Sequence, residues 1–139
     1  MGILESTVVS LRIFGEDLDP DELTAMLGTS PTAAFRKGDP RSTRPGSPPR
    51  PEGSWHLKSE RASPGDLDSQ IRDLLARTTK DPTVWRRIHD RFRADLFAGL
   101  FMTSANDGLT LTPDTLSAAS VRGLAIGLDI YDSIPADQA

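Results

Sequence analysis

The sequence predicts an α+β fold, in which a mixed, mostly antiparallel sheet of five or six strands carries helices mainly on one face. Short segments of alternating apolar and polar residues predict the strands, because successive side chains of a strand point to opposite faces. Capping signals ahead of amphipathic segments predict the helices. The length of 139 residues suits a single domain, 1–139, with one hydrophobic core.

The order of the expected elements is compatible with a ferredoxin-like β-α-β-β-α-β core that carries an extra hairpin and helix. Such an analogy concerns the fold and assigns no function. Strands are expected at 7–14, 32–38, 54–59, 94–103, 109–112 and 124–131. Helices are expected at 20–27, 66–79, 82–92 and 113–123.

The first strand is predicted by Val9, Leu11 and Ile13, which alternate with Ser10 and Arg12. A buried face on one side and a polar face on the other follow from this alternation.

The helix at 20–27 has the clearest start and stop signals in the chain. Asp19 can cap the first free amides, and Pro20 suits the first helical position because its missing N–H is not needed there. Glu22 is expected to reach back to the amide of Asp19 and close a capping box, and Gly28 is expected to end the helix.

The acidic residues around this helix start admit a second interpretation, a calcium site. Their spacing lacks the glycine and the final glutamate of an EF-hand loop, so capping is preferred and no metal is expected. The cluster consists of Glu16, Asp17, Asp19, Asp21 and Glu22.

The next two strands, 32–38 and 54–59, flank a proline- and arginine-rich loop at 38–53 that has too few apolar residues to order itself. We expect this loop to be mobile. In the following strand Trp55 and Leu57 share one face, and Trp55 is expected to anchor the core; the alternative is a surface platform for stacking.

The two central helices follow. Ser63 with Pro64 is expected to cap the helix at 66–79, and Asp81 with Pro82 the helix at 82–92. Leu67, Ile71, Leu74 and Leu75 form the apolar stripe of the first helix, and Trp85, Ile88 and Phe92 that of the second.

The C-terminal third should add three strands and a helix. The strand at 94–103 is apolar on both faces, which favours a central position in the sheet. Asp107-Gly108 is typical of a hairpin turn before the short strand at 109–112. The last helix should bury Leu116, Ala119, Ser120, Gly123 and Leu124, and 133–139 should be a frayed polar tail.

Several of these segments, in their order, resemble a bacterial domain-of-unknown-function family, the one numbered 4279. The shared elements are LRIFGEDLDPDELTAMLGTSPT, FRKGDPR, GSWHL and a late GLDIY, which together span nearly the whole chain. The resemblance implies a small bacterial domain, and it supplies no catalytic residues.

Charge is unevenly distributed along the chain, although the net charge is only −4. Residues 36–93 hold 14 of the 16 basic residues and 8 of the 20 acidic ones, a local balance of +6, and the remainder is at −10. This split predicts either a dipolar molecule that steers a charged partner or charge pairs that solvate the surface.

The composition excludes several classes of site. The chain has no cysteine, so a disulfide framework, a thiolate zinc site and a cysteine nucleophile are excluded. No P-loop, dinucleotide fingerprint or nucleophile elbow occurs, and no cofactor is expected. No signal peptide or membrane-spanning segment is evident, which favours a cytoplasmic protein.

Arginines supply the best candidate binding residues, because the guanidinium fork suits carboxylates and phosphates. The candidate binding residues are Arg41, Arg44, Arg50, Trp55, Arg86, Arg87 and Arg91. The leading hypothesis is a non-enzymatic interaction module that binds a charged protein partner, a class that includes inhibitors and immunity proteins. The alternatives are nucleic-acid or nucleotide binding through 36–93, and a small enzyme that uses His56 or His89 with a carboxylate.

Overall fold

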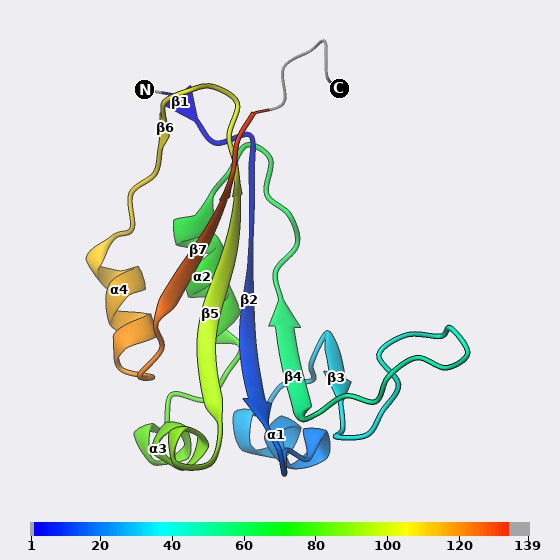
Figure 1. Ribbon diagram of the computed structural model, residues 1–139. Helices are drawn as coiled ribbons and strands as arrows, with labels where there is room; N and C mark the ends of the chain where they lie inside the picture. Colours follow the sequence, from blue (N-terminus) through cyan, green and yellow to red (C-terminus); the bar gives the residue numbers. More distant parts are fainter. Residues whose placement is uncertain (1, 134–139) are drawn as a thin grey trace.

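The computed structural model describes residues 2–133, which form a five-stranded sheet, a two-stranded ribbon and four helices (Figure 1). The strands are β1 (Gly2–Ile3), β2 (Ser6–Gly15), β3 (Ala33–Phe35), β4 (Gly53–Lys58), β5 (Arg93–Phe101), β6 (Asp107–Gly108) and β7 (Ile126–Tyr131). The helices are α1 (Pro20–Leu27), α2 (Leu67–Ala76), α3 (Pro82–Arg91) and α4 (Pro113–Ser120). The expected tail at 133–139 lies outside the described residues except for Ser133.

The main sheet has the strand order β3-β4-β2-β5-β7. Neighbouring strands are antiparallel except for β5 and β7, which are parallel. Helix α1 lies between β2 and β3 in the chain, and α2 and α3 lie between β4 and β5. Strands β2 to β5 of this sheet therefore have the ferredoxin-like arrangement. The predicted α+β class with a mostly antiparallel sheet is therefore confirmed, and β7 is an added edge strand.

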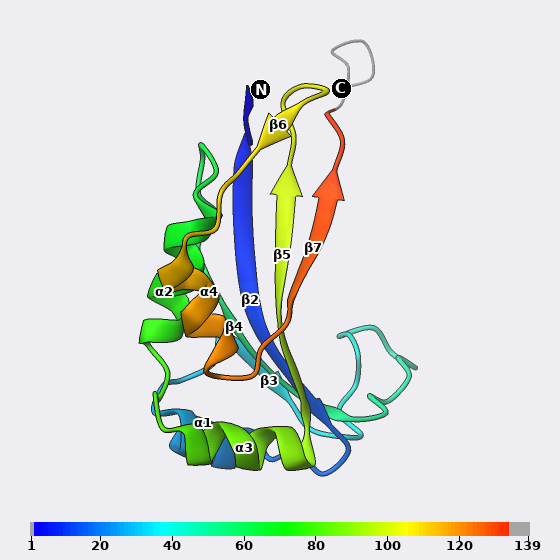
Figure 2. The same ribbon diagram turned by 90° about the vertical axis from the view of Figure 1, so that its left-hand side faces the viewer.

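All four helices lie on the same side of the sheet (Figure 2). The strand register places Leu11 opposite both Leu57 and Leu96, and Ile13 opposite Trp55. These side chains are fully buried beneath the helices, as expected for the apolar half of each alternating strand. No helix of the described residues lies on the opposite face of the sheet, which we call the open face.

Two of the predicted helix starts are confirmed. The Asp19 carboxylate accepts the Asp21 N–H at 3.0 Å, and Gly28 ends α1 with a φ of 76°. The Asp81 carboxylate caps α3 by accepting the Thr83 N–H at 2.9 Å.

Two of the predicted capping contacts are wrong. Glu22 does not close a capping box, because its carboxylate forms an ion pair with Arg91 at 2.8 Å. Ser63 does not cap α2, which has Asp66 at its N-cap; the Ser63 hydroxyl instead donates to the Glu5 carbonyl at 3.0 Å. In both cases the side chain that the local pattern assigned to a helix cap contacts a residue that is more distant in the sequence.

The predicted hairpin turn and the strand at 109–112 are also wrong. Asp107 and Gly108 form β6, which pairs in parallel with β1. The Asp107 carboxylate accepts the N–H groups of Thr103 at 2.6 Å and Ser104 at 3.1 Å, so the side chain closes the turn and the backbone is free to pair.

The buried face of α4 and of the residues after it differs in part from the predicted one. Ala119 and Leu124 are buried as expected, but Leu116 is 48% exposed, Ser120 and Gly123 are also exposed, and Thr115 is buried instead. The cause lies in α2, where the Asp68 carboxylate accepts the Thr112 N–H at 2.8 Å and so caps α4 from a neighbouring helix. This tertiary cap sets the rotation of α4 about its axis.

Arg122 follows α4 and is only 5% exposed. Its guanidinium donates to the carbonyls of Leu75 at 3.1 Å and Ala118 at 3.0 Å, and to the Thr78 hydroxyl at 3.3 Å. Among the described residues it forms no ion pair with a carboxylate. The carbonyl at the end of α2 and the one near the end of α4 provide negative dipole ends that compensate the charge.

We expect Arg122→Ala to lower the free energy of unfolding by about 2–4 kcal/mol, because it leaves buried carbonyls without donors. Urea unfolding followed by circular dichroism measures this change. Arg77→Ala, which truncates an exposed arginine at the end of α2, is the matched control and should stay within about 0.5 kcal/mol of the parent. Equal losses in the two variants would contradict this role for Arg122.

Candidate binding surface

The open face combines aromatic rings with basic side chains. Strand register places its residues together, because Arg12 lies opposite both His56 and Asp95, and Ser10 lies opposite Lys58 and Phe97. The open face includes Val8, Ser10, Arg12, Phe14, His56, Lys58, Asp95, Phe97, Phe101, Asp129 and Tyr131. The second apolar side of β5, which no described helix covers, belongs to this open face.

Arg12 is the centre of this surface. Its guanidinium makes two hydrogen bonds of 2.9 Å to the Asp95 carboxylate and lies over the Phe97 ring, 4.2 Å from the centroid. It also lies 5.5 Å from the centroid of Phe14. The bidentate pair holds the guanidinium in one orientation, and its aliphatic and planar parts cover the rings.

A second arginine covers the other end of the face. Phe101 and Tyr131 are stacked with centroids 4.7 Å apart, and the Arg61 guanidinium lies 4.3 Å from the Phe101 centroid. Arg61 also donates to the Ser6 hydroxyl at 2.9 Å. Each cation–π contact contributes about 0.5–1 kcal/mol at an exposed site, so the arginines protect these rings only weakly from a competing ligand.

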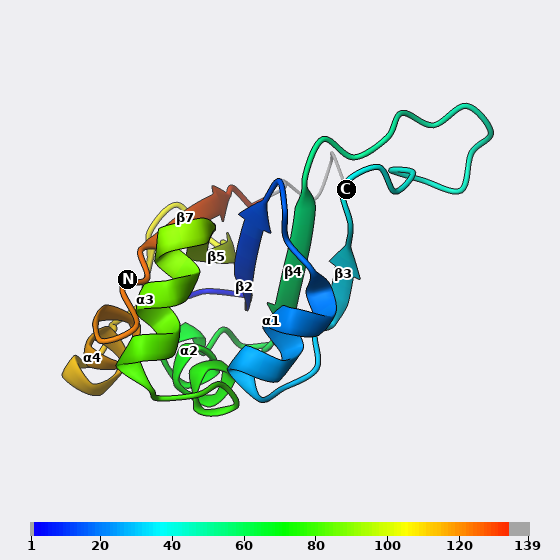
Figure 3. The same cartoon turned by 90° about the horizontal axis from the view of Figure 1, so that it is seen from below.

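Residues 36–52 form a projecting hairpin, which we call the arm. It extends from β3 and β4 on the side of the sheet away from the helices (Figures 2 and 3). Backbone hydrogen bonds join its two halves, from Arg50 N–H to the Asp39 carbonyl at 2.7 Å and from Arg41 N–H to the Pro48 carbonyl at 3.1 Å. The composition of the loop predicts that it cannot order itself, yet its two halves are paired; its mobility stays a prediction.

The arm meets the open face at a cavity of about 370 Å³. Arg50 lies over the Phe35 ring, 3.5 Å from the centroid, which fixes the base of the arm to β3. Arg41 and Arg44 are exposed and, among the described residues, form no ion pair. The residues that line the cavity are Phe14, Arg41, Arg50, Pro51, Glu52 and Ser54.

His56 lies beside this junction, half-buried and edge-on to Phe14 with the ring centroids 5.5 Å apart. Burial lowers the pKa of His56, and the positive charges of Arg12 and Arg50 lower it further. Three segments that are distant in sequence therefore meet at one basic site. In the described part of the chain His56 makes no hydrogen bond to a carboxylate, and the His89 Nε2 atom lies 2.8 Å from the Arg122 carbonyl instead.

We expect the His56 ring to titrate below its ordinary value of 6.5 in the folded protein. The unfolded chain then binds more protons between the two pKa values, so the free energy of unfolding falls as pH falls below about 6.5. Histidine NMR spectra give the pKa, and His56→Gln assigns the resonance and removes this part of the pH dependence. A His56 pKa at or above 6.5 would contradict the site geometry.

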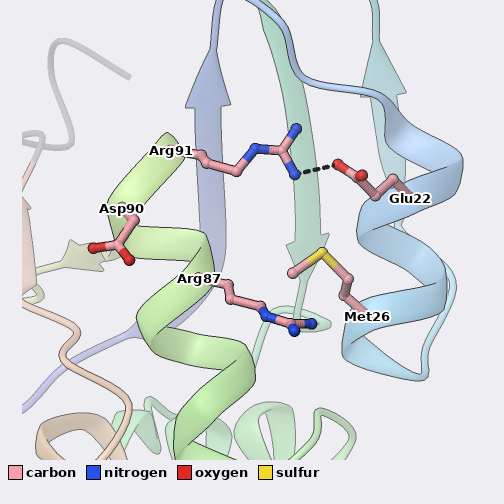
Figure 4. Close-up of a pocket in the computed structure, with 5 residues that line it drawn as sticks. All are labelled: Glu22, Met26, Arg87, Asp90 and Arg91. Atoms are coloured by element: carbon pink, nitrogen blue, oxygen red, sulfur yellow. Dashed lines mark ion pairs between the residues drawn. The ribbon is translucent and has the colours of Figure 1, made fainter.

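The arginines of α3 lie on the other side of the molecule, and two of them, Arg87 and Arg91, line a groove between α1 and α3 (Figure 4). The groove encloses about 480 Å³, and its lining residues are Glu22, Met26, Arg87, Asp90 and Arg91. Arg91 is paired with Glu22 at 2.8 Å and with Asp17 at 3.6 Å. Arg87 has no such pair among the described residues, and Arg86 donates to the Thr83 hydroxyl at 3.2 Å.

The structure thus divides the predicted binding residues into two groups. Arg41, Arg44 and Arg50 belong to the arm and its junction with the open face, and Arg86, Arg87 and Arg91 belong to α3 on the helical side. Trp55 has no exposed surface, and its indole N–H donates to the Thr24 hydroxyl at 3.2 Å. It therefore anchors the core and cannot contact a ligand at the surface.

The fold also mixes the two charge populations that the sequence separates. Acidic residues around α1 pair with Arg36, Lys37 and Arg91 of the basic segment. On the open side, four exposed cations form no ion pair with any described residue. They are Arg41, Arg44, Lys58 and Arg61. Arg12 and Arg61 are not among the predicted binding residues, because their significance depends on the rings beneath them.

Within residues 2–133, no group of three or more histidine, aspartate or glutamate side chains could hold a metal ion. No helix in the same range is long and apolar enough to cross a bilayer.

Comparison with known proteins gives one match. No curated protein and no solved structure matches the chain. The profile of a domain of unknown function, DUF4279, matches residues 5–133, which includes the open face, the arm and the α1–α3 groove. The chain therefore belongs to the DUF4279 family.

Proposed function

We propose that the protein is a non-enzymatic interaction module that binds an acidic surface of another protein through the open face and the arm. The observation that carries this proposal is the position of the arm, which projects on the open side of the sheet and holds two exposed arginines there (Figure 3). Carboxylates of a partner would meet Arg41 and Arg44 at the rim and Lys58 and Arg61 on the sheet.

The electrostatics of the open side support an acidic partner. Of its own carboxylates, Asp95 and Glu52 are engaged by Arg12 and Arg93, and Asp129 accepts the Tyr131 hydroxyl at 2.6 Å. The remaining cations would attract an acidic surface at long range, which raises the association rate and makes it depend on salt. Phe14, Phe97 and Phe101 supply the apolar contact area that a specific interface needs at its centre.

A protein partner is favoured over nucleic acid because the chain as a whole is acidic, with a net charge of −4. The inhibitor or immunity class is one form of this proposal, in which the bound partner is an enzyme.

We expect the double variant Arg41→Glu/Arg44→Glu to weaken binding of the partner at least about tenfold, equivalent to about 1.4 kcal/mol, because it places like charges at the rim. The partner is captured from nuclease-treated lysate, purified, and its affinity measured by calorimetry at low and high salt. The matched control is Arg77→Glu/Lys80→Glu, which makes the same change of charge on two exposed residues of the helical side.

The control variant should bind as the parent does. Equal binding by the parent and the arm variant would contradict the proposed surface. Capture that nuclease abolishes, with nucleic acid recovered from the bound material, would contradict a protein partner and favour phosphate binding.

A further inference from the structure

We propose that two copies of this chain associate through the outer edge of β7, which joins their sheets into one continuous sheet. This inference rests on the backbone and side chains of β7 and is independent of the acidic partner proposed above.

Within residues 2–133, backbone groups at alternate residues on the outer edge of β7 have no hydrogen-bond partner. The Leu96 N–H donates to the Ala125 carbonyl at 2.9 Å, and the Met102 N–H donates to the Tyr131 carbonyl at 3.0 Å. Odd-numbered residues of β7 therefore direct their backbone groups toward β5. Because these directions alternate along a strand, Ile126, Leu128 and Ile130 direct theirs outward.

The side chains along this edge are unusually apolar for a free edge. Leu128 is 47% exposed and Ile130 is 58% exposed, both on the helical side of the sheet. Lysine, proline and extreme shortness are common devices that protect free edges from pairing. The six residues of β7 include neither lysine nor proline, and Asp129 is their only charged residue.

Two β7 strands that pair antiparallel about a two-fold axis at Leu128 would use the outward backbone groups and bury the exposed apolar side chains. Leu128 then lies opposite its own copy and Ile126 opposite Ile130 of the partner, and all three have outward backbone groups. Such a pair exchanges about six N–H···O hydrogen bonds. Asp129 lies opposite Gly127 of the partner, so no like charges meet.

Other registers are less favourable. An axis at Asp129 would place two carboxylates directly opposite each other, which is destabilising. An axis at Gly127 would bring in Leu124, which is 6% exposed and lies outside the strand. The sequence of β7 is thus self-complementary about Leu128, as a closed two-fold interface requires.

Exposed apolar residues beside β7 extend the same surface. Leu116 and Val121, in and just after α4, are 48% and 63% exposed. Helix α4 lies at the β7 end of the helical layer (Figure 3), so the two copies would bring these residues toward one another below the joined sheet.

The first test is the mass of the full chain by sedimentation equilibrium over a range of concentrations. We expect a reversible dimer, with a dissociation constant at least tenfold higher in Leu128→Lys, which places like charges at the axis. Ile3→Lys makes the same change at an apolar residue that is 68% exposed on β1, and it should dimerise as the parent does. Circular dichroism confirms that both variants are folded.

The second test fixes the register. The chain has no cysteine, so Leu128→Cys introduces a single thiol at the proposed axis. The two Cα atoms of a hydrogen-bonded pair lie about 5.5 Å apart, within reach of a short bismaleimide. We expect covalent dimer from Leu128→Cys and only background from Ile3→Cys. A monomer at all concentrations, or a dimer insensitive to Leu128→Lys and not cross-linked at Leu128→Cys, would overturn the proposal.

Discussion

The burial of the Arg122 guanidinium is the constraint on which the helical layer depends. A buried charge is tolerated only when its donors are satisfied, and here helix carbonyls satisfy them. The same residue accepts a contact from α3, since its carbonyl lies 2.8 Å from His89 Nε2. Helices α2, α3 and α4 thus meet at Arg122. Because these helices lie on one side of the sheet, they leave its other face uncovered.

Much of the fold could be predicted from local sequence because local forces decide it. The alternation of Val9, Leu11 and Ile13 fixes which face of β2 is buried, and Asp19 and Gly28 mark the ends of α1 through their own backbone contacts. The errors occurred where a distant group competes. Glu22 pairs with Arg91 across two helices, and Asp68 rotates α4, so the pattern within each helix was insufficient.

The candidate surface was predictable only in part for the same reason. Arg41 and Arg44 could be selected because a proline-rich loop without apolar residues must be exposed. Arg12 could not, because its importance arises from Asp95 and Phe97, more than eighty residues away in sequence. One signal was available: a strand apolar on both faces requires cover on both faces, and the predicted helices could cover only one.

The two edges of the sheet are unequal. β3 has three residues and runs directly into the arm, so it offers a neighbour few backbone groups. β7 has six and is joined to the four-stranded core through α4 by a parallel crossover. The two edges therefore differ in access, because β7 leaves backbone groups open to a further strand on one side, whereas the arm restricts extension of the sheet on the other.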